Sequence, residues 1–184
     1  MDWTALLLSH WQVKLVSITL IVAYVIDAKQ LKVPNWITFP LAISGVAYWT
    51  IAQGWTGLGF SLLGLAAGLA TLLPLYAFGG MGAGDVKLMA GAGAWVGMGL
   101  ITQSFIVIAL VGGLMAAVMI LVSGRWRHHL RMAGVILGDV LRLRSATGCF
   151  DRATERKPTM TLLPYGIPVC IGAIGTFIQQ GVLF

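Results

Sequence analysis

The sequence predicts an all-α, polytopic membrane protein with about six transmembrane helices, and three observations support this fold class. Of the 184 residues, 58% are hydrophobic and only 10% are charged, whereas soluble domains carry about 25% charged residues. The apolar residues form continuous runs, and about 20 of them suffice for a helix to cross the hydrocarbon core of a bilayer. They also lack the alternation that a membrane β-barrel strand requires. We therefore expect one transmembrane domain over residues 1–184.

Basic residues are concentrated in two segments of the chain, which carries a net charge of +6. Lys29 and Lys32 follow the first apolar run, and eight more lie between Arg125 and Lys157. Short loops rich in Lys and Arg remain in the cytoplasm, so this pattern predicts membrane topology and no nucleic-acid binding. We expect a protein of the cell inner membrane with both termini outward. The loop at about 124–160 would be cytoplasmic and would contact anionic lipid.

The first three spans are expected at 11–26, 36–52 and 58–78. A basic loop, AKQLKVPN (28–35), joins the first two, and in it Pro34 breaks the helix while Asn35 is a residue type that caps the next one. An uncharged turn, GWTG (54–57), separates the second span from the third. In the third span Gly64 and Gly68 have the spacing that allows close approach of two membrane helices.

The remaining spans are expected at 86–98, 101–122 and 161–182. The Gly-rich stretch GGMGAGD (79–85) precedes the fourth span, and only Gly97 and Gly99 mark its boundary with the fifth. The last span contains Pro164, Gly166 and Pro168 close to its start. Helix breakers at membrane depth usually contact protein or a water-filled cavity.

Two of the six acidic residues require an explanation, because Asp27 ends the first span and Asp85 begins the fourth. The expected topology brings both to the cytoplasmic face. A carboxylate at membrane depth costs about 2.5–3.5 kcal/mol on insertion scales, so such residues tend to be paired or functional. Two facing carboxyls share a proton, which is the arrangement that an aspartic protease uses to activate water and to protonate the scissile carbonyl.

Plainer interpretations of both residues stay open at this point. Asp85 could be a helix N-cap or a first-turn acid that complements the helix dipole, and Asp27 could be an interfacial residue paired with Lys29 or Lys32. GxGD also occurs easily by chance in a chain with 24 glycines.

Other kinds of site are poorly supported by the sequence. The Gly-rich stretch lacks the G-K-[ST] of a phosphate-binding loop. Of the three histidines, His10 lies at the far end of the first span, and His128 and His129 lie among arginines, so we expect no metal site and no cofactor. Cys149 and Cys170 form no CxxC pair, and we expect no disulfide between them.

Three motifs in order resemble those of the type IV prepilin peptidases. GMGAGDVKLMAGAGAWVG (81–98), preceded by Gly80, looks like the family's GxGD signature. Asp27 followed by KVPN (32–35) is similar to its second motif, and LPYGIPVCIGA (163–173) resembles the P-[YF]-G segment of its last helix. Together these motifs cover most of the chain.

The resemblance implies a GxGD intramembrane aspartyl peptidase that cuts the short basic leader of prepilins at the cytoplasmic membrane face. Asp27 and Asp85 would be the catalytic pair. Gly82 and Gly84 would let the backbone approach Asp85 and the substrate, and Lys87 would hold a carboxylate or extend to the interface. Further residues from the matching motifs would support the site: Pro34, Asn35, Pro164, Tyr165 and Gly166.

The loop between the first two spans distinguishes this chain from the family's large members. Those carry a cytoplasmic insertion with two CxxC pairs and an N-methyltransferase activity, whereas here only AKQLKVPN joins the spans. The chain looks most like the short peptidases of Flp, or tight-adherence, pilus systems, so we expect no methyltransferase activity. The archaeal preflagellin and prepilin peptidases are similar in size.

Two other classes of function fit the same acids. A transporter or proton relay also uses buried carboxylates and broken helices, although both acids here are expected near one face. A non-catalytic scaffold of a pilus or secretion machine would keep them for packing alone.

Overall fold

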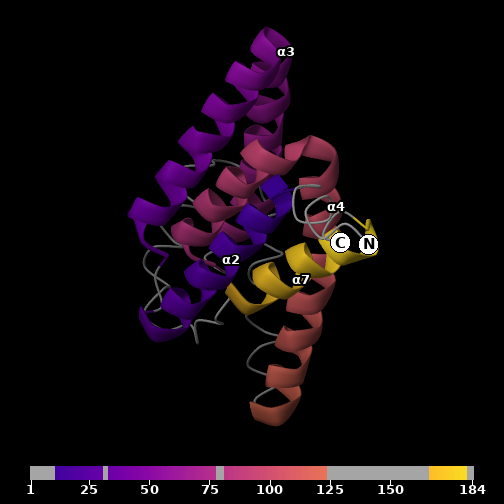
Figure 1. Ribbon diagram of the computed structural model, residues 1–184. Helices are drawn as coiled ribbons and strands as arrows, with labels where there is room; N and C mark the ends of the chain where they lie inside the picture. Colours follow the sequence, from indigo (N-terminus) through magenta and orange to yellow (C-terminus); the bar gives the residue numbers. More distant parts are fainter. Residues whose placement is uncertain (1–10, 31–32, 78–80, 124–165, 182–184) are drawn as a thin grey trace, which may run out of the picture.

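The computed structural model describes residues 11–30, 33–77, 81–123 and 166–181, and these form helices without any strand. The helices are α2 (Trp11–Gln30), α3 (Asn35–Ala77), α4 (Ala83–Ser123) and α7 (Gly166–Gln179). The most extensive packing is between α3 and α4, and α7 packs on α4 and on α2 (Figure 1). Within the described ranges, the all-α prediction is confirmed.

Helix α3 is broken at Gly54, where the predicted turn begins. Gly54 has a φ of 61°, in the left-handed region that favours glycine. The chain reverses there, because the ring centroids of Trp49 and Phe60 lie 4.8 Å apart on either side of the break. The turn is shorter than the predicted GWTG, since Trp55 to Gly57 already belong to the returning helix. Gly57 then lies directly on the backbone carbonyl of Trp49.

Helix α4 is broken at Gly97, which has a φ of 79°. The Phe60 ring fills the space where a side chain at this position would lie. Carbonyls at the end of a helical limb have no partner within it, and here side chains of α3 bind two of them. Ser61 Oγ donates to the Ala94 carbonyl at 2.8 Å, and Trp49 Nε1 donates to the Trp95 carbonyl at 2.9 Å. Of the two predicted boundary glycines, Gly97 is the break, and Gly99 is helical.

Small residues bring α3 and α4 into backbone contact, as the spacing of Gly64 and Gly68 predicts. A Cβ on Gly64 would overlap the backbone of Gly93, and a Cβ on Gly68 would overlap the carbonyl of Met89. The close approach of these two helices is therefore confirmed. A third such contact joins α7 to α4, where a Cβ on Gly172 would lie 2.7 Å from the Cα of Ile108.

The exterior of the bundle is apolar over several helices, and some of its large hydrophobic side chains are more than half exposed. Examples from α2, α3, α4 and α7 are Ile18, Trp36, Ile51, Trp55, Leu110, Leu114 and Ile171. Helices α3 and α4 are long and apolar enough to cross a membrane, over Asn35–Tyr76 and Ala83–Met115. A continuous helix of either length would exceed a ~30 Å hydrocarbon core, and the breaks divide each into shorter limbs.

Other predicted features lie outside the described residues. The basic loop at 124–160 and most of the start of the last span belong to this group, and α7 covers only part of the predicted 161–182. The number of membrane crossings and the outward position of both termini stay predictions.

Candidate active site

Asp27 lies on the buried face of α2, in its last two turns. The buried residues of this face are Val13, Val16, Ser17, Leu20, Ala23 and Asp27. They recur every three or four positions, with Ser17 next to Val16, which places them on one side of a helix. Asp27 is only 6% exposed, so the helix directs its carboxyl toward the other helices and away from the surroundings.

Asp85 lies in the first turn of α4 and is 5% exposed. The helix begins at Ala83, so Gly82 occupies the N-cap position and Asp85 the third helical position. The carboxylate accepts a hydrogen bond from the backbone N–H of Gly82, which is one half of a capping box. Asp85 is thus a first-turn acid and not the N-cap residue itself.

Capping accounts for one oxygen of Asp85 and leaves the other unexplained. Oδ2 is the oxygen near Gly82, because a Cβ on that glycine would lie 3.3 Å from it. Oδ1 is buried and has no hydrogen-bond partner among the described residues. A buried polar atom without a partner costs about 1–3 kcal/mol, and such atoms in native structures call for a specific reason.

The two carboxyls lie close enough to interact. Asp27 exerts an electrostatic effect on Asp85 through the interior of the bundle, although 57 residues of sequence lie between them. Both acids are buried inside the bundle, and their role as a catalytic pair stays a prediction. Chemically, two buried carboxyls that interact can share a proton, and can then supply one base and one acid to a bound molecule.

The second predicted motif packs directly against the start of α4. Gly84 faces Val33, and a Cβ on this glycine would lie 2.8 Å from the Val33 Cβ and 3.0 Å from the Val33 carbonyl oxygen. One turn further on, Lys87 Nζ donates a 3.1 Å hydrogen bond to Asn35 Oδ1. The same ammonium lies over the Phe39 ring, 5.2 Å from its centroid.

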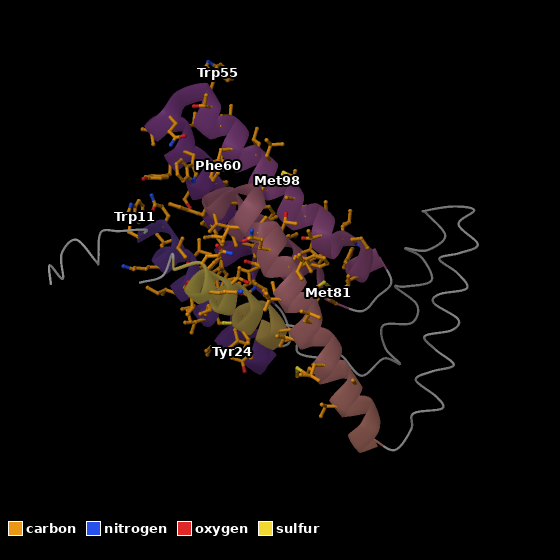
Figure 2. All side chains as sticks on the ribbon, turned by 90° about the vertical axis from the view of Figure 1, so that its right-hand side faces the viewer. Trp11, Tyr24, Trp55, Phe60, Met81 and Met98 are labelled. Carbon is orange, nitrogen blue, oxygen red and sulfur yellow. The ribbon has the colours of Figure 1, made fainter. Side chains whose placement is uncertain are left out.

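The structure describes some of the predicted supporting residues near the acids, and others lie outside the described residues. Pro34 lies between Val33 and Asn35, and its carbonyl accepts a 3.1 Å hydrogen bond from the Ile37 N–H at the start of α3. Gly166 is the first residue of α7, and both views place this end of α7 beside the end of α2 that carries Asp27 (Figures 1 and 2). Pro164 and Tyr165 lie outside the described residues.

Two residues of this region were missed by the sequence reasoning. Val33 is buried against Gly84, and Phe39 covers one side of the Lys87 ammonium. Val33 belongs to the quoted KVPN motif, so its place between Lys32 and Pro34 was a usable signal. Phe39 gave none, because one aromatic residue among many in an apolar span is not distinctive.

The comparisons with known proteins identify a family for this chain. The model of the type IV leader peptidase family matches residues 15–121 of the chain, which is more than half of its length. The chain belongs to this family. The match includes Asp27, Asn35, Asp85 and Lys87, and ends before α7.

Curated relatives in the family come from several bacteria. A prepilin leader peptidase/N-methyltransferase of Aeromonas hydrophila is 34% identical over 111 residues, which are 56% of this chain and 37% of the relative. The protein of the same description from Neisseria gonorrhoeae is 35% identical over 107 residues, which are 54% of this chain and 37% of the relative. The aligned part of the chain thus spans little more than a third of these relatives. No solved structure matches the chain.

Proposed function

We propose that the protein is a membrane aspartyl endopeptidase that removes the short basic leader peptide from type IV-like prepilins, with those of the Flp class as its expected substrates. The relatives described as prepilin leader peptidases support the reaction. The observation that carries the proposal is the pair of buried carboxyls, because one oxygen of Asp85 is buried without a partner beside Asp27. That oxygen can accept a hydrogen bond from a water molecule or a substrate group that enters the site.

The proposed chemistry uses the pair as one base and one acid. The ionised carboxyl takes a proton from water, whose oxygen attacks the scissile carbonyl carbon, while the protonated carboxyl gives its proton to the carbonyl oxygen. Collapse of the tetrahedral intermediate then breaks the C–N bond, and the leaving amine takes a proton from the pair. Both carboxyls are needed, since either one alone can supply only half of the proton transfers.

The place of the pair in the fold agrees with such a substrate. Both acids lie at helix ends, Asp27 close to the end of α2 and Asp85 at the start of α4. A prepilin whose own helix lies in the bilayer would present its cleavage site at the depth of a helix end. We further propose that the site faces the cytoplasm and that the protein lacks N-methyltransferase activity.

The test is co-expression with a candidate prepilin of the Flp class, with the cleaved product followed by its mobility shift and its new N-terminus. We expect cleavage by the wild type and a loss of at least about 1,000-fold in Asp27→Asn and in Asp85→Asn, because removal of one member of a catalytic unit abolishes most of its effect. The Asn side chain keeps the shape and removes the titrating group.

Asp139→Asn is the matched control, since it removes a carboxyl from the segment at 124–160 and should leave cleavage intact. All variants are checked for membrane insertion and for equal amounts of protein. Cleavage at wild-type rates by both inserted active-site variants would exclude the dyad. Failure of the wild type to cleave any prepilin offered would favour a relay or a scaffold.

A further inference from the structure

Residues 33–35 meet α4 on both sides of Asp85. On one side Gly84 packs against Val33, with no room for a side chain between them. On the other side Lys87 donates its hydrogen bond to Asn35. The same short segment leads back along the chain to α2, which carries Asp27. Asp27 and this segment are thus only a few residues apart in the chain.

Lys87 is an unusual residue to find at this position. It is the fifth residue of α4, beyond the first turn in which the helix dipole acts, so the dipole gives no reason for a cation here. Its ammonium has no carboxylate partner among the described residues, and its contacts there are the neutral Asn35 side chain and the Phe39 ring. The neighbouring Asp85 keeps its free oxygen and does not pair with it.

The two contacts of the ammonium hold it in one place. The side-chain oxygen of Asn35 accepts a charge-assisted hydrogen bond, which is stronger than a bond between neutral groups. The Phe39 ring attracts the cation through its π face. Because Asn35 is the first residue of α3, this bond ties the start of α3 to the start of α4.

We propose that Lys87 is a positioning residue, whose bond to Asn35 sets the separation of the Asp27 and Asp85 carboxyls. This inference depends on the proposed peptidase function of the pair. Gly84 and Val33 supply the apolar contact on one side of Asp85, and Lys87 and Asn35 supply the polar contact on the other. Without the polar contact the first turn of α4 can pivot about Gly84, which moves the Asp85 carboxyl relative to Asp27.

The first experiment measures prepilin cleavage in detergent with purified variants. Lys87→Met keeps the stem and removes the donor, and we expect kcat to fall on the order of 10- to 100-fold with little change in KM, since small misplacements of catalytic groups have effects of this size. Lys87→Arg retains a charged donor and should recover most of the lost rate. Lys14→Met removes a lysine near the other end of α2 and should leave kcat unchanged.

Asn35 variants separate positioning from substrate binding. Asn35→Asp gives Lys87 a carboxylate partner, so a positioning role predicts retained cleavage, whereas Asn35→Leu should behave like Lys87→Met. If Lys87 instead binds an anionic group of the substrate, Asn35→Asp would neutralise it and would raise KM. A rise in KM with unchanged kcat in Lys87→Met, or a loss in Asn35→Asp equal to that in Asn35→Leu, would overturn the proposal.

A second experiment needs no cleavage, so it stays informative if the proposed function fails. In a protein carrying Cys149→Ser and Cys170→Ala, the pair Asp27→Cys and Asp85→Cys is oxidised in membranes and the rate of disulfide formation is measured. We expect Lys87→Met to slow this rate several-fold and Lys87→Arg and Lys14→Met to leave it unchanged. Equal rates in all four proteins would overturn the positioning role, whatever their activity.

Discussion

The two oxygens of the Asp85 carboxyl have different surroundings, and each of the two interpretations of the residue concerns a different oxygen. An acid in the first turn of a helix is commonly explained by capping and by the helix dipole. Here Oδ2 lies at the N-cap residue Gly82, and this role is complete without Oδ1. Burial of Oδ1 without a partner adds nothing to the stability of the helix. The proposed catalytic role of Asp85 would therefore use Oδ1.

Gly82 and Gly84 both precede Asp85, but the space for an added Cβ differs between them. Substitution of each by alanine should therefore affect stability differently. A Cβ on Gly84 would meet Val33 at 2.8 Å and its backbone oxygen at 3.0 Å, so the two segments would have to separate. We expect Gly84→Ala to lower the free energy of unfolding by about 1–3 kcal/mol through overpacking, and to reduce cleavage. Thermal denaturation in detergent and prepilin cleavage measure the two effects.

Gly82→Ala should be milder, because its Cβ would approach only the Asp85 Oδ2 at 3.3 Å and the N–H donor is kept. Gly99→Ala is the control, since this helical glycine has open space around it and alanine favours a helix by up to ~1 kcal/mol. Equal stability of Gly84→Ala and Gly99→Ala would contradict the close contact between Gly84 and Val33.

At the scale of helices, the sequence predicted the breaks better than the contacts that stabilise them. The uncharged GWTG segment predicts the turn that contains Gly54, and the four-residue spacing of Gly64 and Gly68 predicts close helix packing. The break at Gly97 had a weak signal, because the surrounding residues are apolar on both sides. Its cause is tertiary: Phe60 occupies the space beside Gly97, and side chains of α3 bind the free carbonyls. Such partners are distant in sequence and invisible to local patterns.

The break at Gly97 should depend on Ser61 more than on a serine of equal burial elsewhere. Ser61 and Ser104 are both fully buried, but Ser61 Oγ bonds across helices to the Ala94 carbonyl, whereas Ser104 Oγ bonds to Leu100 of its own helix. We expect Ser61→Ala to cost about 1–3 kcal/mol, because it leaves a buried carbonyl without a partner. The Leu100 carbonyl keeps its helical bond in Ser104→Ala, so that change should cost less. Denaturation of the two variants in the same detergent compares them, and an equal loss would show that the Ala94 carbonyl has another partner.

At the scale of the whole molecule, the carboxyl pair and an aromatic cluster lie toward opposite ends of α2. The aromatic cluster comprises Trp11, Tyr48, Trp49, Phe60 and Trp95, linked by ring contacts between 4.8 and 5.7 Å. Trp11 and Asp27 lie about 24 Å apart along the helix, close to the thickness of a hydrocarbon core. The prediction that Asp27 meets Asp85 rests on the alternation of helix ends between membrane faces. The contacts of Val33 and Phe39 were not predictable, since they depend on how α3 and α4 pack.

The basic residues predict which end of the bundle faces the cytoplasm, and this membrane orientation can be tested with one cysteine at each end. Figure 2 shows Trp55 at one end of the bundle, far from Tyr24 and Met81 near the carboxyl pair, and Trp55 is 86% exposed. In a protein carrying Cys149→Ser and Cys170→Ala, Trp55→Cys should react with a membrane-impermeant maleimide in intact spheroplasts. Gln30→Cys, at the end of α2 and beside the lysines that predict a cytoplasmic position, should react only after lysis. The reverse pattern would place the carboxyl pair on the outer side, where a leader that has not crossed the membrane could not reach it.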